Sequence, residues 1–195
     1  MPAKSKRGPV QVAHRDADAN REKILTTAAG LMARRGHNVP LTEIAEAAGV
    51  GVATFYRRFP DRAALLDALQ RRGYDICLRI LAQIRADGLT GPDAIEAYLH
   101  RCHAVSDELV AMPLRGAEPL LDVEAANAKK RIILELQEFL DQGRAARSLH
   151  FDVSVKDVVV LSTIMATPLP HGPDWPSNSR HLITVFVRGI RNPDV

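Results

Sequence analysis

The sequence has 195 residues, of which 46% are hydrophobic, 25% charged and 5% aromatic. This length suffices for one ordinary domain or two small ones, each with a buried core. No apolar run approaches the roughly 18 to 20 residues needed to cross a bilayer, so the composition excludes a membrane-spanning protein.

The N-terminal residues and the cysteines indicate the compartment. Met1 to Arg15 carries lysine and arginine but no apolar stretch, which excludes a secretory signal and predicts a cytoplasmic protein. Cys77 and Cys102 form no C-x-x-C motif, and this argues against a disulfide scaffold or a thiol-based zinc site. We expect both cysteines to be buried apolar side chains.

Positive charge is concentrated in the first third of the chain. The whole sequence carries a formal charge of +3, but the residues up to Tyr74 include 13 Lys plus Arg against 7 Asp plus Glu, or +6, and the rest 13 against 16, or −3. This division suggests that the N-terminal part meets a polyanion. A chance fluctuation of surface charge is the alternative explanation.

The first half of the chain predicts an arm followed by four helices. Residues 1–18 mix lysine, arginine, proline and glycine without periodicity, which predicts a flexible basic arm. From Ala19 onward apolar residues recur at spacings of three and four, and glycine or proline marks the helix ends. The predicted helices span residues 19–35, 40–48, 52–59 and, after a cap at Asp61, 61–81.

The second half also predicts helices, over about 92–109, 120–141, 151–165 and 177–191. Segment 151–165 is rich in valine, which favours strands, but Ser154 followed by Asp157 resembles a capping box and a lone strand would have no partner. A proline-dense loop over 168–176 precedes the last helix. The predicted fold class is therefore all-α.

The stretch from Leu41 to Phe59 carries the chemistry. Two short helices joined by a glycine turn, the second rich in cationic and hydroxyl side chains, predict a helix-turn-helix, a unit that the major groove of DNA admits. Gly49 permits the sharp turn, and Val50 fills the angle between the helices. Phe55 and Phe59, four residues apart, face the core. The outward-facing residues of the second helix are then Ala53, Thr54, Arg57 and Arg58.

These residues resemble the TetR family of bacterial transcriptional regulators. The resemblance covers about residues 21–69 and rests on Ile44-Ala45, Ala48-Gly49-Val50 and Thr54-Phe55-Tyr56-Arg57-Arg58-Phe59-Pro60-Asp61-Arg62. It implies an all-helical homodimer of about nine helices, with three DNA-binding helices, a divergent ligand-binding domain and the last two helices paired with their mates in a four-helix bundle. The expected domains are the basic arm 1–18, a helix-turn-helix domain 19–64 and an effector-binding and dimerisation domain 65–195.

The resemblance also implies the DNA contacts. It places on the recognition helix Val52, Ala53, Thr54, Tyr56 and Arg57, and Arg62 at the start of the following helix. Arg57 and Thr54 suit base reading, while Tyr56 and Arg62 suit phosphate contact, as does Thr42. A packing role is the alternative for Tyr56, and a solvated basic face for Arg57 and Arg58.

One position departs from the family pattern. The family often has serine or threonine where this chain has Gly51, at the cap of the recognition helix. A hydroxyl contact to phosphate is therefore expected to be missing here.

The C-terminal part predicts a sensor and a dimer interface. A ligand pocket is expected among its helices, with core packing as the alternative for each lining residue: Tyr74, Leu78, Leu81, Tyr98, Cys102, Met112, Leu136, Phe139 and Met165. The low aromatic content favours a modest apolar ligand. The last two helices carry more apolar surface than one subunit covers, which predicts a dimer interface, with packing inside the subunit as the alternative for each residue: Val155, Val158, Val159, Ser162, Leu182, Ile183, Phe186, Val187 and Ile190.

Catalysis and metal binding find little support in the sequence. His100, His103 and Asp107 have a spacing that can hold a metal, but solvated helical histidines are far commoner. No nucleophile elbow and no glycine-rich phosphate loop occurs. We therefore expect no cofactor, no metal and no enzymatic activity.

The sequence thus predicts a DNA-binding transcriptional regulator, a dimeric repressor that a small-molecule effector releases from a palindromic operator. Its predicted partners are double-stranded operator DNA, a second copy of the chain and an effector of unknown identity, with no membrane. The alternative is a protein-interaction module with a degenerate helix-turn-helix, and the Gly51 position favours it slightly.

Overall fold

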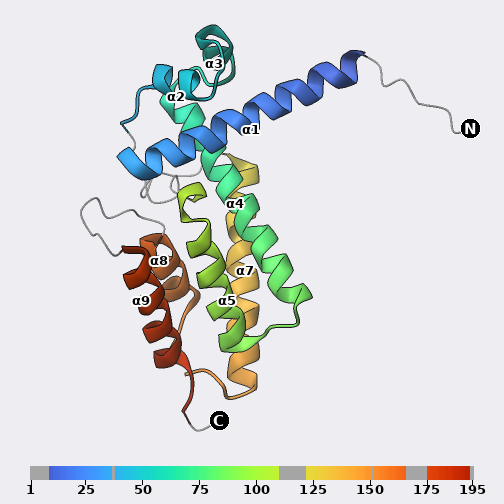
Figure 1. Ribbon diagram of the computed structural model, residues 1–195. Helices are drawn as coiled ribbons and strands as arrows, with labels where there is room; N and C mark the ends of the chain where they lie inside the picture. Colours follow the sequence, from blue (N-terminus) through green and yellow to red (C-terminus); the bar gives the residue numbers. More distant parts are fainter. Residues whose placement is uncertain (1–8, 37, 110–121, 151, 166–174, 194–195) are drawn as a thin grey trace, which may run out of the picture.

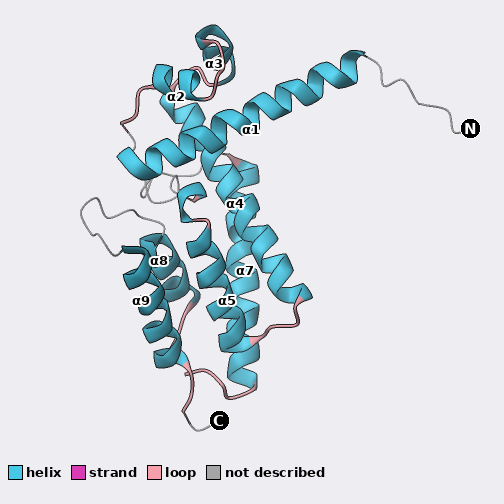
Figure 2. Cartoon of the chain, in the orientation of Figure 1, coloured by secondary structure: helices cyan, strands magenta, loops and turns pink. Residues whose placement is uncertain are grey.

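The computed structural model describes residues 9–36, 38–109, 122–150, 152–165 and 175–193. Within these ranges the chain forms eight α-helices and one short 3-10 helix, and the only β pairing is an isolated bridge between Leu149 and Arg191 (Figures 1 and 2). The all-α prediction is confirmed. The elements are α1 (Pro9–Arg35), α2 (Leu41–Ala47), α3 (Val52–Arg58), α4 (Arg62–Ala86), α5 (Gly91–Ala104), η1 (Ser106–Glu108), α7 (Val123–Ala145), α8 (Val155–Met165) and α9 (Trp175–Ile190).

Helix α1 begins much earlier than predicted. It starts at Pro9, so the flexible arm predicted over 1–18 is wrong for residues 9–18. Proline is well tolerated in the first turn of a helix, and no glycine or second proline interrupts the chain until Gly30. The first part of α1 extends away from the core, so it forms a helix without needing an apolar stripe (Figure 1).

Most helix ends are where capping residues place them. Gly36 has φ +77°, as the residue after a helix requires, and the Asp61 carboxylate accepts a hydrogen bond from the Ala64 backbone N–H at 2.8 Å. At α8 the Asp157 carboxylate accepts from the Ser154 backbone N–H at 2.9 Å and from its hydroxyl at 2.6 Å. The helix prediction for this valine-rich segment is therefore confirmed.

The first core joins α1, α2, α3 and the start of α4. Its fully buried side chains include Ile24, Leu25, Met32, Ile44 and Phe55. Two helices as short as α2 and α3 are not stable alone, because helix nucleation is unfavourable. This core is what holds them in place.

The second core joins α4, α5, α7, α8 and α9. Helices α4 and α7 both pack on α5, and α8 and α9 also contact α5. Helices α5 and α7 approach each other closely at Gly91 and Gly143. A Cβ placed on Gly143 would lie only 3.1 Å from the Gly91 Cα. None of the described helices combines the length and the hydropathy needed to cross a bilayer.

Helix α4 belongs to both cores. Its residues Leu65, Ala68 and Leu69 are buried in the first core, while those from Tyr74 onward are buried in the second. The first core thus extends five residues past the predicted boundary at 64. A single continuous helix connects the two parts (Figure 1), so a tilt of α4 in one part moves the other.

Candidate nucleic-acid interface

A tight turn joins α2 to α3. Gly49 has φ +62°, and its N–H donates to the Glu46 carbonyl at 2.8 Å, while the Val50 N–H donates to the Ala45 carbonyl at 2.9 Å. These two bonds define a Schellman motif, which ends α2 and reverses the chain. Val50 is half-buried and packs against the first core, as predicted.

Helix α3 has one buried face and one exposed face. Phe55 and Phe59 point inward, with ring centroids 5.7 Å apart, and both are buried. Val52 is 48% exposed and Tyr56 39% exposed. Ala53, Arg57 and Arg58 are also exposed, and Thr54 is half-buried. The predicted recognition residues therefore share the outward side of one helix, at the end of the molecule remote from α9 (Figure 1).

Two more predicted contacts flank α3. Thr42, in α2, is exposed. Arg62, the first residue of α4, is half-buried, and its guanidinium donates to the Val39 carbonyl at 2.6 Å. One Arg62 donor thus holds the segment before α2 in place, a contact that the sequence did not predict.

The positions of α2 and α3 are fixed by further contacts. An ion pair between Arg35 and Glu43 connects the end of α1 to α2. At the start of α3 the Gly51 carbonyl accepts bonds from Thr54 and Phe55 at 2.9 Å each, but no side chain caps the helix. The start of α3 is therefore uncapped, and the loss of a hydroxyl contact to phosphate at Gly51 stays a prediction.

The residues predicted to line an effector pocket lie in the second core. Those in the described ranges are buried, except Leu78, which is half-buried and packs against the cluster. Met112 lies outside the described residues. A pocket among these side chains stays a prediction, since core packing places them equally well.

Five residues predicted for the dimer interface are instead buried inside the subunit. They are Val155, Val158, Ile183, Val187 and Ile190, each less than a tenth exposed. They face the second core, because α8 and α9 turn one apolar side toward α5. Val159, Ser162 and Phe186 are half-buried, and Leu182 is 43% exposed. On α8 and α9, the exposed apolar side chains that the sequence did not single out are Val160, Ile164 and Val185.

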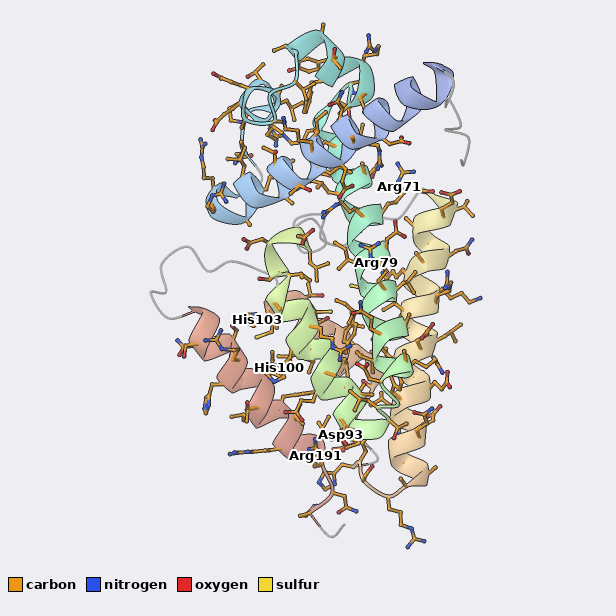
Figure 3. All side chains as sticks on the ribbon, turned by 45° about the vertical axis from the view of Figure 1, so that its right-hand side comes forward. Arg71, Arg79, Asp93, His100, His103 and Arg191 are labelled. Atoms are coloured by element: carbon orange, nitrogen blue, oxygen red, sulfur yellow. The ribbon has the colours of Figure 1, made fainter. Side chains whose placement is uncertain are left out.

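The candidate metal residues lie apart from any cluster. Among the described side chains no group of three His, Cys, Asp or Glu could hold a metal ion. The His103 Nε2 atom lies 3.2 Å from the buried Ser179 hydroxyl, and His100 lies 4.0 Å from Glu96 (Figure 3). His103 therefore helps join α5 to α9.

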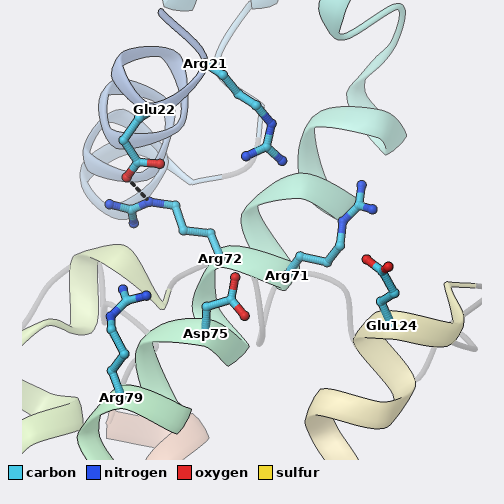
Figure 4. A pocket seen from close by; sticks show the side chains of 7 residues that line it. All are labelled: Arg21, Glu22, Arg71, Arg72, Asp75, Arg79 and Glu124. Atoms are coloured by element: carbon cyan, nitrogen blue, oxygen red, sulfur yellow. Dashed lines mark hydrogen bonds and ion pairs between the residues drawn. The ribbon is translucent and has the colours of Figure 1, made fainter. Parts of the chain in front are cut away.

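Sequence reasoning missed one concentration of charge. Arg21 of α1 and Arg71, Arg72 and Arg79 of α4 line a single cleft (Figure 4). The three α4 arginines lie near one side of the helix. Charged residues occur there at every fourth position: Arg71, Asp75 and Arg79. That recurrence was the available signal, but it is also typical of an ordinary solvated helix face.

Comparison with known proteins agrees with this geometry. Residues 24–69 match the family model described as bacterial regulatory proteins of the tetR family. The matched segment runs from the first buried residue of α1 through α2 and α3 to the last residue of the first core. The resemblance to the TetR family is thereby confirmed.

Relatives and solved structures extend the likeness beyond the matched segment. The chain is 29% identical to an HTH-type transcriptional regulator of Staphylococcus aureus strain USA300, over 60% of this chain and 60% of the relative. It is 28% identical to a TetR transcription regulatory protein from Mycobacterium vanbaalenii, with 92% of this chain and 99% of that chain covered and a TM-score of 0.60. AibR, solved with isovaleryl coenzyme A and operator DNA, shares the fold at 20% identity, with 88% and 97% covered and a TM-score of 0.65.

Proposed function

We propose that this chain, whose N-terminal core has the tetR-family DNA-binding architecture, is a dimeric transcriptional repressor that a small molecule releases from a palindromic operator. The observation that carries the proposal is the outward face of α3. It presents Thr54, Tyr56 and Arg57 together on a helix that the Schellman turn and two buried phenylalanines hold rigidly. The HTH-type regulators that the chain resembles support the same conclusion.

Each predicted contact residue has a distinct part in the proposal. The Arg57 guanidinium can make a bidentate contact with guanine in the major groove, and the Thr54 hydroxyl and methyl can contact a neighbouring base. The Tyr56 hydroxyl and the Arg62 guanidinium contact backbone phosphates and set the register. Arg58 and Thr42 add phosphate contacts beside them.

The palindromic operator follows from the proposed dimer. Two copies related by a two-fold axis present two α3 helices to successive major grooves, roughly 34 to 36 Å apart. The exposed residues Val160, Ile164, Leu182 and Val185 of α8 and α9 supply the apolar surface for this pairing. Release follows when an effector changes the tilt of α4 and with it the separation of the two reading helices, a coupling of only a few kcal/mol.

The test is DNA binding by the full chain, with duplexes selected from a random pool. Arg57→Ala is expected to weaken binding by about 1–3 kcal/mol and to relax the preference at one base position. Tyr56→Phe, which removes only a hydroxyl, is expected to weaken binding to all DNA sequences alike. Arg131→Ala, an exposed cation on α7, is the matched control and should leave binding unchanged.

The salt dependence of binding distinguishes a DNA-binding regulator from a protein-interaction module. DNA binding should fall steeply as salt rises, with a slope that tracks the number of phosphates neutralised. A protein-interaction module with a degenerate helix-turn-helix would show no such slope. Unchanged DNA binding by Tyr56→Phe and Arg57→Ala together would refute the assignment of α3 as the reading helix.

A further inference from the structure

The junction between the two cores contains a cleft lined entirely by charged side chains. It has a volume of about 440 Å³, within the range of small-molecule sites. Helices α1, α4 and α7 form its walls (Figure 4). The lining residues are Arg21, Glu22, Arg71, Arg72, Asp75, Arg79 and Glu124.

Guanidinium groups are the largest set of side chains that line this cleft. Four guanidinium groups face three carboxylates, and one of those carboxylates, Glu22, is already bonded to the Arg72 Nε atom at 2.7 Å. Arg72 also pairs with Glu108 at 2.5 Å and Arg71 with Asp122 at 3.1 Å. Within the described ranges, Arg21 and Arg79 have no ion-pair partner, and neither do the Asp75 and Glu124 carboxylates, so an entering anion would meet two unpaired guanidinium groups beside two unpaired carboxylates.

Two hydrogen-bond donors beside the cleft are also unsatisfied. The Arg71 Nε and Arg72 Nη1 atoms are buried and find no acceptor in the described part of the chain. A buried donor without a partner costs roughly 1–3 kcal/mol, more when it is charged. An acceptor entering the cleft with a small shift of either guanidinium would remove that cost.

We propose that this cleft binds a small polyanion, a molecule with at least two negatively charged oxygens on a phosphoryl or carboxylate group. Guanidinium groups bind such oxygens in bidentate pairs. The walls offer no apolar side chain, which disfavours the modest apolar ligand suggested by the composition. The ligand joins Arg21 on α1 to Arg71 and Arg79 on α4.

The position of the cleft makes its occupant an effector, a step that rests on the proposed function. Helix α1 lies between the cleft and the α2–α3 unit (Figures 1 and 3), so the anion does not occupy the DNA surface. A bridge from α1 to α4 fixes the first core against the helix that enters the second. Occupancy therefore changes how the reading helix is held.

Calorimetric titration of the full chain with pyrophosphate at constant ionic strength tests binding directly, and citrate in a parallel titration distinguishes phosphoryl from carboxylate ligands. We expect saturable binding of one ligand per chain. Arg21→Gln and Arg79→Gln should each weaken it about tenfold or more, the loss of one charge-assisted hydrogen bond. Arg131→Gln, the exposed cation on α7 outside the cleft, should stay within about twofold of the original chain.

Two results would overturn the site. One is the absence of saturable binding of either anion at millimolar concentration. The other is an equal loss of affinity in Arg131→Gln and Arg79→Gln, which would indicate diffuse attraction to a basic surface. Arg21 and Arg79 make no ion pair within the described chain, so their replacement should leave thermal stability unchanged, and a melting curve of each variant checks this.

Fluorescence anisotropy on a selected DNA duplex tests the regulatory part. Saturating ligand should change the DNA affinity of the original chain by about fivefold or more and leave that of Arg79→Gln unchanged. An equal change in both proteins would show competition with DNA phosphates and would overturn the effector role. If the chain binds the anion but no DNA, the anion site stands and the proposed function fails.

Discussion

Position 51, at the start of α3, is a residue at which we predict an effect on both stability and DNA binding. Its φ of −59° and ψ of 137° suit any residue, and a Cβ there meets no atom within 4 Å. We predict that Gly51→Ser raises stability by up to about 1 kcal/mol, because the serine hydroxyl can accept a hydrogen bond from a backbone N–H of the first turn, which no side chain caps in this chain. It should also tighten DNA binding through a phosphate contact. Thermal unfolding and anisotropy measure the two effects.

Gly51→Ala is the control for this prediction. It adds the Cβ without the hydroxyl, and alanine is a poorer N-cap than glycine. If the alanine variant gains as much stability and affinity as the serine variant, the hydroxyl is not the cause.

Some residues of the candidate site could be predicted from the sequence, and others could not. Phe55 and Phe59 follow the spacing of four that buries one side of a helix, so the exposed side follows by elimination. The Arg62 bond to Val39 could not be predicted, since it joins positions with no shared periodicity. The arginines of the cleft come from two helices distant in sequence, and only packing brings them together.

The close approach of α5 and α7 depends on Gly143. A Cβ at this position would lie 2.7 Å from Leu149 Cγ and 3.1 Å from the Gly91 Cα. We predict that Gly143→Ala destabilises the protein by about 1–3 kcal/mol, because the backbone at Gly91, with φ +54°, cannot move away freely. This cost exceeds the gain of up to about 1 kcal/mol from the better helix propensity of alanine. Urea unfolding measures the difference.

Gly189→Ala on α9 is the matched control. It also replaces a helical glycine, but a Cβ there meets nothing within 4 Å, so this variant should gain stability from propensity alone. Equal shifts in the two variants would show that the α5–α7 contact tolerates a methyl group.

Helices were predicted well where the signal is local and poorly where it depends on packing. Asp61 and Ser154 with Asp157 are local caps, and the structure confirms both. Gly143 was read as a helix terminator, yet α7 continues to Ala145, because this glycine serves a neighbouring helix. The extension of α1 to Pro9 was missed since no apolar stripe marks it in the sequence.

At the scale of the whole molecule, the sequence predicted that α8 and α9 carry excess apolar side chains. It did not predict which of these side chains pack inside the subunit and which stay exposed. Both helices have period 3.6, and the side facing α5 could not be known before α5 was placed. The residues that pack inward, such as Ile183 and Val187, are no more apolar in type than those that stay outward. The outward apolar surface consists of Val160, Ile164, Leu182 and Val185.

This outward surface gives the prediction for the assembly. The double variant Ile164→Glu with Val185→Glu places charge where the proposed dimer buries two half-exposed side chains, so it should convert dimers to folded monomers. Leu134→Glu on α7, at a site 57% exposed, is the control and should stay dimeric. Light scattering after size exclusion measures the mass.

The same double variant tests the link between the dimer and DNA binding. Because a monomer can bind only one half-site of the DNA, the double variant should lose most of its affinity for a duplex with two half-sites and retain its affinity for a duplex with one. Dimers that persist in the double variant would place the interface elsewhere on the molecule.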